Sequence, residues 1–516
     1  MDELLRTSLL WRLFAALAAL YYRTFLPRMF AAIHRAFAES LPGRALRRLL
    51  GGQPAVERSA YRRLMDRGNA WLCGIGARVV PVLEDSLVYR IYRRVMGALR
   101  SSLLLGWLFA GGMTGFLLFL FSSYAIMDYL LRDVLQLAAI ASVWDELLML
   151  FSLVWVIHRR VDTRRPLSST ANGIGLWIAF YLTVGVLLLM TVRPAPTVNF
   201  TGFRASMEYL AVFYLVTHLI RDERDFREMY LTMVIIATVL ALHGIWQFIV
   251  GVPIPASWTD AAEGAVRTRV YSIFSNPNIM GAYMILFAPM TIGLAYACER
   301  PSQKVLFWLC GLAMCAGCLF TMSRGAWLAL AIAAVLFALL IDRRLLAVAC
   351  TLPFVRSRIG YLFTPQFADS NARGGRAKRW ATAIGYLKAT DPVFGMGYGM
   401  YGGAVAVQNP VLPWVEYMYV DNYYVKILTE NGIVGVTAFG MMLLGLVGNG
   451  LRACVRTAKT RWSPLCAGML CGLIGVLIHS VFESIWEEPY MMALFFAVAA
   501  MLAWAGLLRR RTQETA

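Results

Sequence analysis

The sequence reads DPVFGMGYG from Asp391 to Gly399, inside a polar, basic and glycine-rich stretch that runs from Arg373 to Gly435. Apolar runs long enough to cross a bilayer stand on both sides of this stretch. Irregular backbone near membrane depth is tolerated only where it is buried in protein or lines a cavity. We therefore expect the stretch to hold the chemistry of a membrane protein.

The composition excludes an ordinary soluble globule. Of 516 residues, 59% are hydrophobic and 15% are charged, and the mean hydropathy is +0.60. These values are typical of an all-α protein that crosses the membrane several times. A formal charge of +19 would suggest nucleic acid as the partner of a soluble protein. Here the excess of Lys and Arg that keeps cytoplasmic loops inside is the better explanation, so no nucleic-acid partner is expected.

The apolar runs predict about twelve transmembrane helices within a domain at residues 101–508. They lie at 103–121, 134–157, 173–192, 205–220, 229–250, 279–297, 304–321, 325–341, 344–355, 430–450, 465–482 and 490–508. The run 344–355 is short, but only an even number of spans puts both termini and all the basic loops in the cytoplasm. These loops are His158–Arg165, Arg221–Arg227, Asp342–Arg344, Arg452–Arg461 and the tail 509–516. This topology predicts a large extracytoplasmic loop, 356–422, between the ninth and tenth helices.

The first 100 residues are rich in arginine. They contain 17 Arg, no Lys and 7 acidic residues, and their longest apolar run, Leu13 to Tyr22, is too short to span a bilayer. We interpret residues 1–100 as cytoplasmic or interfacial helices that lie against anionic lipid. A solvated basic tail that only fixes the orientation of the protein is the alternative.

Many cations fall on the extracytoplasmic side in this topology, against the usual orientation rule. They are Arg193, Arg204, Arg267, Arg269, Arg324, Arg356, Arg358, Arg373, Arg376, Lys378, Arg379 and Lys388. Guanidinium groups bind phosphate oxygens in a bidentate manner and do not titrate. The sequence therefore predicts an anion site on the outside, and a diphosphate fits it.

Four motifs carry a family resemblance. They are Phe274-Ser275-Asn276-Pro277-Asn278, Thr321-Met322-Ser323-Arg324-Gly325, the pair Arg376 and Trp380 followed by the glycine turn, and the Asn422 helix with its E-x-G. Their types and order resemble the O-antigen ligase and polymerase superfamily over roughly residues 100–508. One departure is Asp421, because many ligases of the family carry His at that position.

The resemblance implies a GT-C-like helical membrane fold and a metal-independent, inverting glycosyl transfer without a cofactor. The donor would be a glycan on undecaprenyl diphosphate, and the acceptor would be lipid A-core or another surface glycan. The reaction would take place at the outer face of the bacterial inner membrane, in lipopolysaccharide or related polysaccharide biosynthesis. A polymerase of the same superfamily is the alternative, and a non-enzymatic polysaccharide exporter is a third reading.

Arginines supply the expected phosphate contacts. Arg324 opens a predicted helix, where unpaired N–H groups also favour an anion, although an arginine that snorkels to the interface is the plainer interpretation. By resemblance, a basic residue before the first motif holds the donor diphosphate, with Arg269 the better match and Arg267 the weaker. Arg376 is a candidate phosphate or sugar contact, and Trp380, one helical turn later, is a candidate for stacking on a sugar.

Asp421 has two interpretations that the sequence leaves open. It is suited to cap the helix that follows, and by resemblance it takes the place of the His that acts on the acceptor hydroxyl. Asn422 would orient the acceptor, and Glu430 is expected to pair with an Arg of the loop. Four further residues, His479, Glu483, Glu487 and Glu488, are expected to serve as counter-charges to the basic loop.

Overall fold

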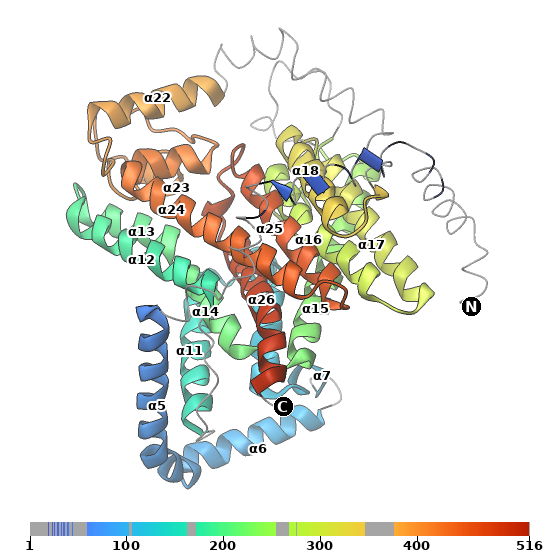
Figure 1. Ribbon diagram of the computed structural model, residues 1–516. Coiled ribbons are helices and arrows are strands. Elements are labelled where there is room, and N and C mark those ends of the chain that lie inside the picture. The colour runs from blue at the N-terminus through green and yellow to red at the C-terminus, as the bar shows by residue number, and fades with distance from the viewer. Residues whose placement is uncertain are drawn as a thin grey trace.

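The computed structural model describes residues 59–102, 106–162, 172–253, 268–274, 276–345 and 376–514, with isolated positions before residue 59. Within these ranges the chain is helical and contains no β-strand. Figure 1 shows the helices gathered into one bundle, with α22 (Arg376–Ala389) at one end and α6 (Leu87–Ser101) at the other.

The described ranges contain 7 helices long and apolar enough to cross a membrane, or up to 8 if one bent pair is counted as a span. They are α12 (Gly173–Thr191), α15 (Glu223–Val250), α16 (Pro277–Ala297), α17 (Pro301–Phe320), α24 (Tyr423–Arg456), α25 (Trp462–His479) and α26 (Pro489–Glu514). The prediction of a helical, multi-pass membrane protein is confirmed.

Two of the predicted spans are broken. The predicted span 103–121 is interrupted between α7 (Gly106–Phe109) and α8 (Gly112–Ser122). Just beyond this span, α8 is bent by 74° from the segment Tyr124–Val134. Ser122 and Ser123 each donate their hydroxyl to the carbonyl four residues earlier, at 2.7 Å in both cases. Such back-bonding bends helices. The predicted span 205–220 is interrupted between α13 (Pro196–Met207) and α14 (Leu210–Leu219).

Two other predicted spans differ in extent. The run 134–157 begins at the last residue of a π-helix, Leu130–Val134, and continues through the short helix α10 (Ala138–Ala141) into α11 (Trp144–Asp162). The run 325–341 is α18 (Arg324–Leu340), which has 17 residues. The ninth span, 344–355, lies almost wholly outside the described residues, so the count of twelve stays a prediction.

The centre of the bundle is the antiparallel pair α16 and α25. Glycines permit its close packing: a Cβ on Gly293 would lie 2.3 Å from the Pro464 carbonyl oxygen, and one on Gly472 would lie 2.2 Å from that of Leu286. Small residues at a helix interface let two backbones approach in this way. Because the helices are antiparallel, the start of α16 meets the end of α25.

The glycine turn packs on α24. Gly395, Gly397 and Gly399 have φ values of 79°, 101° and 69°, which residues with a Cβ rarely adopt. Met396 N–H donates to Thr429 O at 3.0 Å and Gly397 N–H donates to Glu430 O at 2.7 Å, beside a kink in α24 at Gly432. These glycines therefore serve a tight turn.

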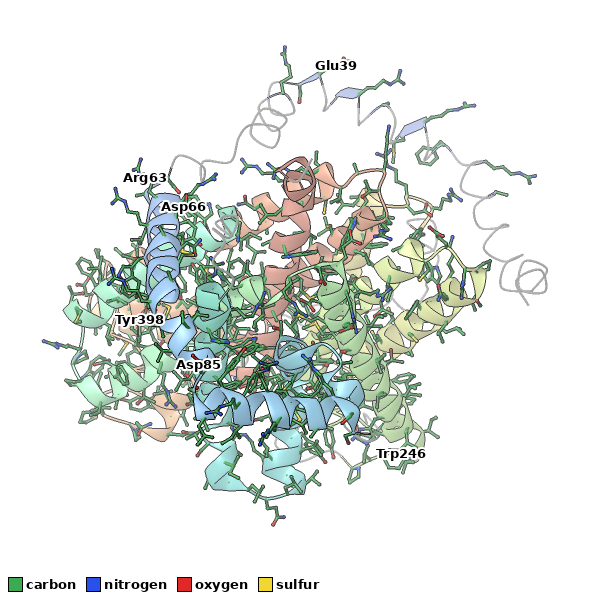
Figure 2. All side chains as sticks on the ribbon, turned by 90° about the horizontal axis from the view of Figure 1, so that it is seen from below. Glu39, Arg63, Asp66, Asp85, Trp246 and Tyr398 are labelled. Carbon is green, nitrogen blue, oxygen red and sulfur yellow. The ribbon has the colours of Figure 1, made fainter. Side chains whose placement is uncertain are left out.

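At the opposite end, α5 (Ala60–Glu84) and α6 form an elbow with its turn at Asp85, which Figure 2 labels together with Arg63 and Asp66 on α5.

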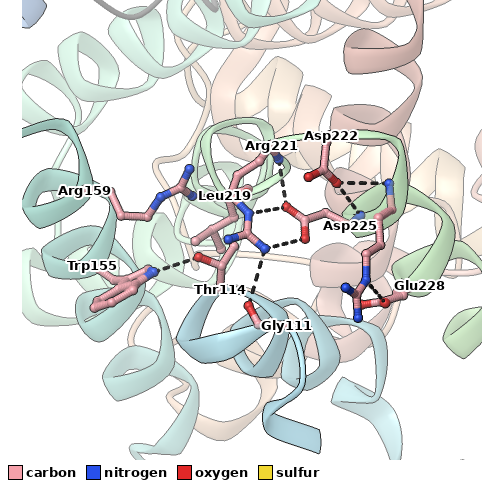
Figure 3. A network of polar contacts seen from close by, with 10 residues as sticks. Gly111, Thr114, Trp155, Arg159, Leu219, Arg221, Asp222, Asp225 and Glu228 are labelled. Atoms are coloured by element: carbon pink, nitrogen blue, oxygen red, sulfur yellow. Dashed lines mark hydrogen bonds and ion pairs between the residues drawn. The ribbon is translucent and has the colours of Figure 1, made fainter. Parts of the chain in front are cut away.

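Close by, Arg221 pairs with Asp225 at 2.7 Å and donates to Gly111 O at 3.3 Å, as Figure 3 shows. Arg159 donates to Leu219 O at 3.2 Å. Arginines of two predicted cytoplasmic loops therefore also connect α8, α11, α14 and α15.

Candidate functional site

Asn278 connects segments that are far apart in the sequence. Its Oδ1 accepts from Arg269 Nη2 at 3.4 Å, and its Nδ2 donates to Glu483 Oε2 at 2.5 Å. His479 Nε2 lies 3.1 Å from the backbone oxygen of Asn278. The site thus joins the segment before α16, the start of α16 and the end of α25.

The local sequence explains why Asn278 sits at this point. Asn276 caps α16 and its Oδ1 accepts from Asn278 N–H at 2.8 Å, while Pro277 occupies the first turn. Proline suits the first helical position, because its missing N–H would have no partner in the helix. The motif is a structured helix entry.

The second motif lies against the first. Arg269 Nε donates to Thr321 O at 3.1 Å, and Ser323 caps α18, so that Arg324 is the first residue of that helix. A Cβ on Gly325 would lie 2.8 Å from the Cβ of Phe482, the neighbour of Glu483. Arg269 and Arg324 therefore stand on segments that both reach the Asn278–Glu483 contact. Arg267 lies outside the described residues.

The helix α22 brings further cations. Arg376 is its first residue, and Arg379 Nη1 pairs with Asp421 Oδ2 at 2.5 Å. Trp380 shares the helix with Arg376, as predicted, and its Nε1 donates to Val420 O at 3.1 Å. Its ring packs against a separate apolar cluster that includes Met400. In this structure Trp380 thus fixes the backbone that leads to Asp421.

Asn422, and not Asp421, caps α24. Asn422 Oδ1 accepts from Tyr424 N–H at 3.0 Å and from Val425 N–H at 3.1 Å. Asp421 precedes the cap with a left-handed φ of 50°, and its carboxylate faces Arg379. The capping interpretation of Asp421 is therefore wrong, because a side chain one residue too early cannot reach these N–H groups.

Glu483 is a carboxyl group with an unusual environment. Burial, and then the negative charge of Asp421, raise its pKa from the usual 4.5 to about 7, although Asn278 and Arg376 act in the opposite direction. At neutral pH such a group can both accept and release a proton. The sequence offered only a counter-charge role, because the contact with Asn278 spans 205 residues.

A second buried charge cluster lies under the glycine turn. Lys426 Nζ is 2.7 Å from Glu430 Oε2 and 3.6 Å from Glu487 Oε1. Glu487 Oε2 also accepts from Ala404 N–H at 3.3 Å. The prediction that Glu430 pairs with an Arg of the loop is wrong. Its partner is Lys426, which lies one turn earlier on the same helix. This cluster holds the loop in place.

Two observations complete the description of the site. Tyr398 and Tyr401 of the loop are buried, while Trp414 is exposed. No group of three or more His, Cys, Asp or Glu side chains suited to a metal ion is present in the parts of the chain that the structure describes.

Comparison with known families gives one result. The family model described as O-antigen ligase matches residues 309–440, a range that includes Arg324, α22, the glycine turn and the start of α24. A search of curated proteins finds no match. The Asn278 motif and Glu483 lie outside the matched range, and the structure brings them to it. Residues 309–440 are therefore similar to the O-antigen ligase family.

Proposed function

We propose that the protein transfers a polysaccharide from undecaprenyl diphosphate to an acceptor hydroxyl, on lipid A-core or another surface glycan, at the outer face of the bacterial inner membrane. One observation carries this proposal: the segments of Arg269, Arg324 and Arg376 converge on the contact between Asn278 and Glu483. This arrangement supports a site with cations beside a proton acceptor. Transfer from a diphosphate needs both.

In this mechanism the arginines bind the diphosphate through paired N–H groups and stabilise the negative charge that develops as it departs. The acceptor oxygen attacks the anomeric carbon from the face opposite the departing diphosphate, so that the configuration inverts. Arginines then take the electrostatic role that a metal ion has in other transferases. The acceptor proton passes to a carboxylate.

Two alternatives remain to be tested. A polymerase would extend one carrier-linked glycan with another, and Asp421 at the position of the ligase His keeps that version open. An exporter needs the cations but no proton acceptor. The pKa of Glu483, raised to about 7 by burial and by Asp421, favours transfer over export.

The decisive experiment uses the purified protein in vesicles with a labelled undecaprenyl-diphosphate glycan, with and without a lipid acceptor. A ligase gives labelled acceptor with the glycan length unchanged. A polymerase gives a ladder of longer glycans without the acceptor. If neither product forms while label crosses the vesicle membrane, the protein is an exporter and the proposal fails.

The arginines provide a second test. Arg324→Lys keeps the charge but loses the planar fork, so we expect transfer to fall by about tenfold or more. Neutralising Arg269, Arg324 and Arg376 together should abolish both donor binding and transfer. Lys388→Gln, an exposed cation at the far end of α22, is the matched control and should leave both unchanged. Full transfer by the triple variant would contradict the phosphate role.

A further inference from the structure

We propose that Glu483 is the catalytic base that accepts the acceptor's proton, and that Asp421 is a positioning residue. This inference rests on the proposed function, which names the reaction but not the group that takes the proton. Glu483 lies outside the range that the family model matches. The contacts of Glu483 and the charges around it support this role.

The contacts of Glu483 leave it one oxygen for an acceptor. Asn278 Nδ2 binds Oε2 at 2.5 Å, and Oε1 lies 3.4 Å from the backbone N–H of Ser484 in a longer contact. The same Asn278 accepts from Arg269, so that the proton acceptor and a phosphate-binding cation share one rigid residue. Such sharing fixes the distance between base and departing diphosphate, as a preorganised site requires.

Asp421 is committed elsewhere. Its carboxylate forms an ion pair with Arg379 at 2.5 Å, at the end of a segment that Trp380 holds through Val420. A carboxylate that already binds a guanidinium is less available to an acceptor hydroxyl, because the hydroxyl must compete with the charge-assisted hydrogen bond. Its charge nevertheless acts on Glu483 and raises the pKa of that group. Asp421 thus tunes the base and orients Arg379.

The step balances with groups already named. The acceptor oxygen forms a bond to the anomeric carbon as the bond from that carbon to the diphosphate oxygen breaks. The electron pair of the broken bond leaves with the polyprenyl diphosphate, whose added negative charge the arginines stabilise. The proton of the acceptor hydroxyl moves to Glu483 and is later released to water.

The pH dependence follows from the groups that face Glu483. They are Asn278 at the start of α16, Arg376 on α22 and Asp421 before α24. Arg269, before α16, and His479 on α25 contact Asn278. Only the ionised carboxylate is a base, so the rate should rise with pH through about 7 and level off above it. Removing the charge of Asp421 lowers the pKa of Glu483, which shifts this rise to lower pH.

The test compares Glu483→Gln with Asp421→Asn in full-length protein in vesicles. Gln keeps the volume and can still accept from Asn278 Nδ2, but it cannot take a proton. We expect kcat to fall by about 100-fold to 10,000-fold, donor KM to stay within about twofold, and the pH-dependent rise to disappear. Glu483→Asp should restore part of the rate, with a pH-dependent rise again present. Glu416→Gln, on an exposed loop carboxylate, is the matched control.

The Asp421→Asn variant should keep measurable transfer, and its transfer rate should rise at lower pH than that of the wild-type protein. Loss of all transfer in Asp421→Asn, together with an unchanged pH profile in Glu483→Gln, would overturn the assignment and return the base to Asp421. Donor binding by each variant, measured with the labelled lipid, separates loss of chemistry from loss of folding. If the wild-type protein itself transfers no glycan, the proposed function fails, and the assignment of the base fails with it.

Discussion

Lys426 is a buried cation between two carboxylates. Its side chain is 7% exposed, and that of Glu430, 2.7 Å away, is 1% exposed. Removing one partner of a buried ion pair leaves an uncompensated charge, which costs about 3–5 kcal/mol. We therefore expect Lys426→Met to lower the thermal unfolding temperature in nanodiscs markedly and to loosen the glycine turn. Limited proteolysis between residues 390 and 404 would report that loosening.

The control for Lys426 is Glu487→Gln. It removes the more distant carboxylate, 3.6 Å from Nζ, and keeps the closer pair intact. In the wild-type protein, burial raises the pKa of Glu487 to about 7, so much of the charge of this carboxyl group is already suppressed at neutral pH. Glu487→Gln should therefore be milder than Lys426→Met, and equal destabilisation by both would contradict the ranking.

At the residue scale, helix-capping preferences predicted where helices begin. The cap at Asn276, the first-turn Pro277 and the position of Arg324 at a helix start all follow from neighbours in the sequence, and the structure has each of them. The contact of Asn278 with Glu483 could not be predicted in this way, because 205 residues separate the two. Such a contact depends on the antiparallel packing of α16 on α25, which no local pattern encodes.

At the element scale, α6 has three kinds of surface. Met96 is buried, and the Tyr92 ring lies 5.9 Å from that of Trp155 on α11. Leu87, Ile91 and Val95, spaced four residues apart, are exposed. Arginines occupy the remaining face: Arg90, Arg93, Arg94 and Arg100. A helix with an exposed apolar stripe beside arginines is typical of one that lies in a membrane interface.

This arrangement leads to a prediction about lipid. Each basic residue near an anionic surface contributes about 1 kcal/mol of attraction. We expect the wild-type protein to unfold at a higher temperature in nanodiscs with anionic lipid than in neutral ones, and the combined Arg90→Gln, Arg93→Gln, Arg94→Gln variant to lose most of that difference. A control with Arg227→Gln and Lys388→Gln should keep it. A lipid effect that is equal in both variants would favour the solvated basic tail.

Element boundaries show where the sequence pattern fails. A tight turn follows from glycines that adopt positive φ, but the contact of this turn with α24 was not predicted. The bend after Ser122 was not predicted either, because hydropathy does not distinguish a serine that bonds back to its own helix from one that packs. The same limit applies at Glu208 and Tyr209, where α13 and α14 separate within one apolar run.

For the whole molecule, the proposal depends on which end of the bundle faces outward. Figure 1 places α22 and α6 at opposite ends, and Arg461, in the turn between α24 and α25, pairs with Glu223 at the start of α15 at 2.5 Å. The excess of basic residues in the loops predicts that the α6 end is cytoplasmic. The arginine cluster around Asn278 then faces the compartment in which surface glycans are assembled.

Cysteine labelling tests this orientation. In a background without native cysteines, Lys388→Cys on α22 should react with a membrane-impermeant maleimide in intact spheroplasts. Lys459→Cys, exposed in the turn between α24 and α25, should react only after permeabilisation. The two positions are matched, since both are exposed lysines at helix ends and neither belongs to the site. The reverse pattern would put the arginine cluster in the cytosol, where an outer-face acceptor cannot reach it, and transfer to a surface glycan would then be excluded.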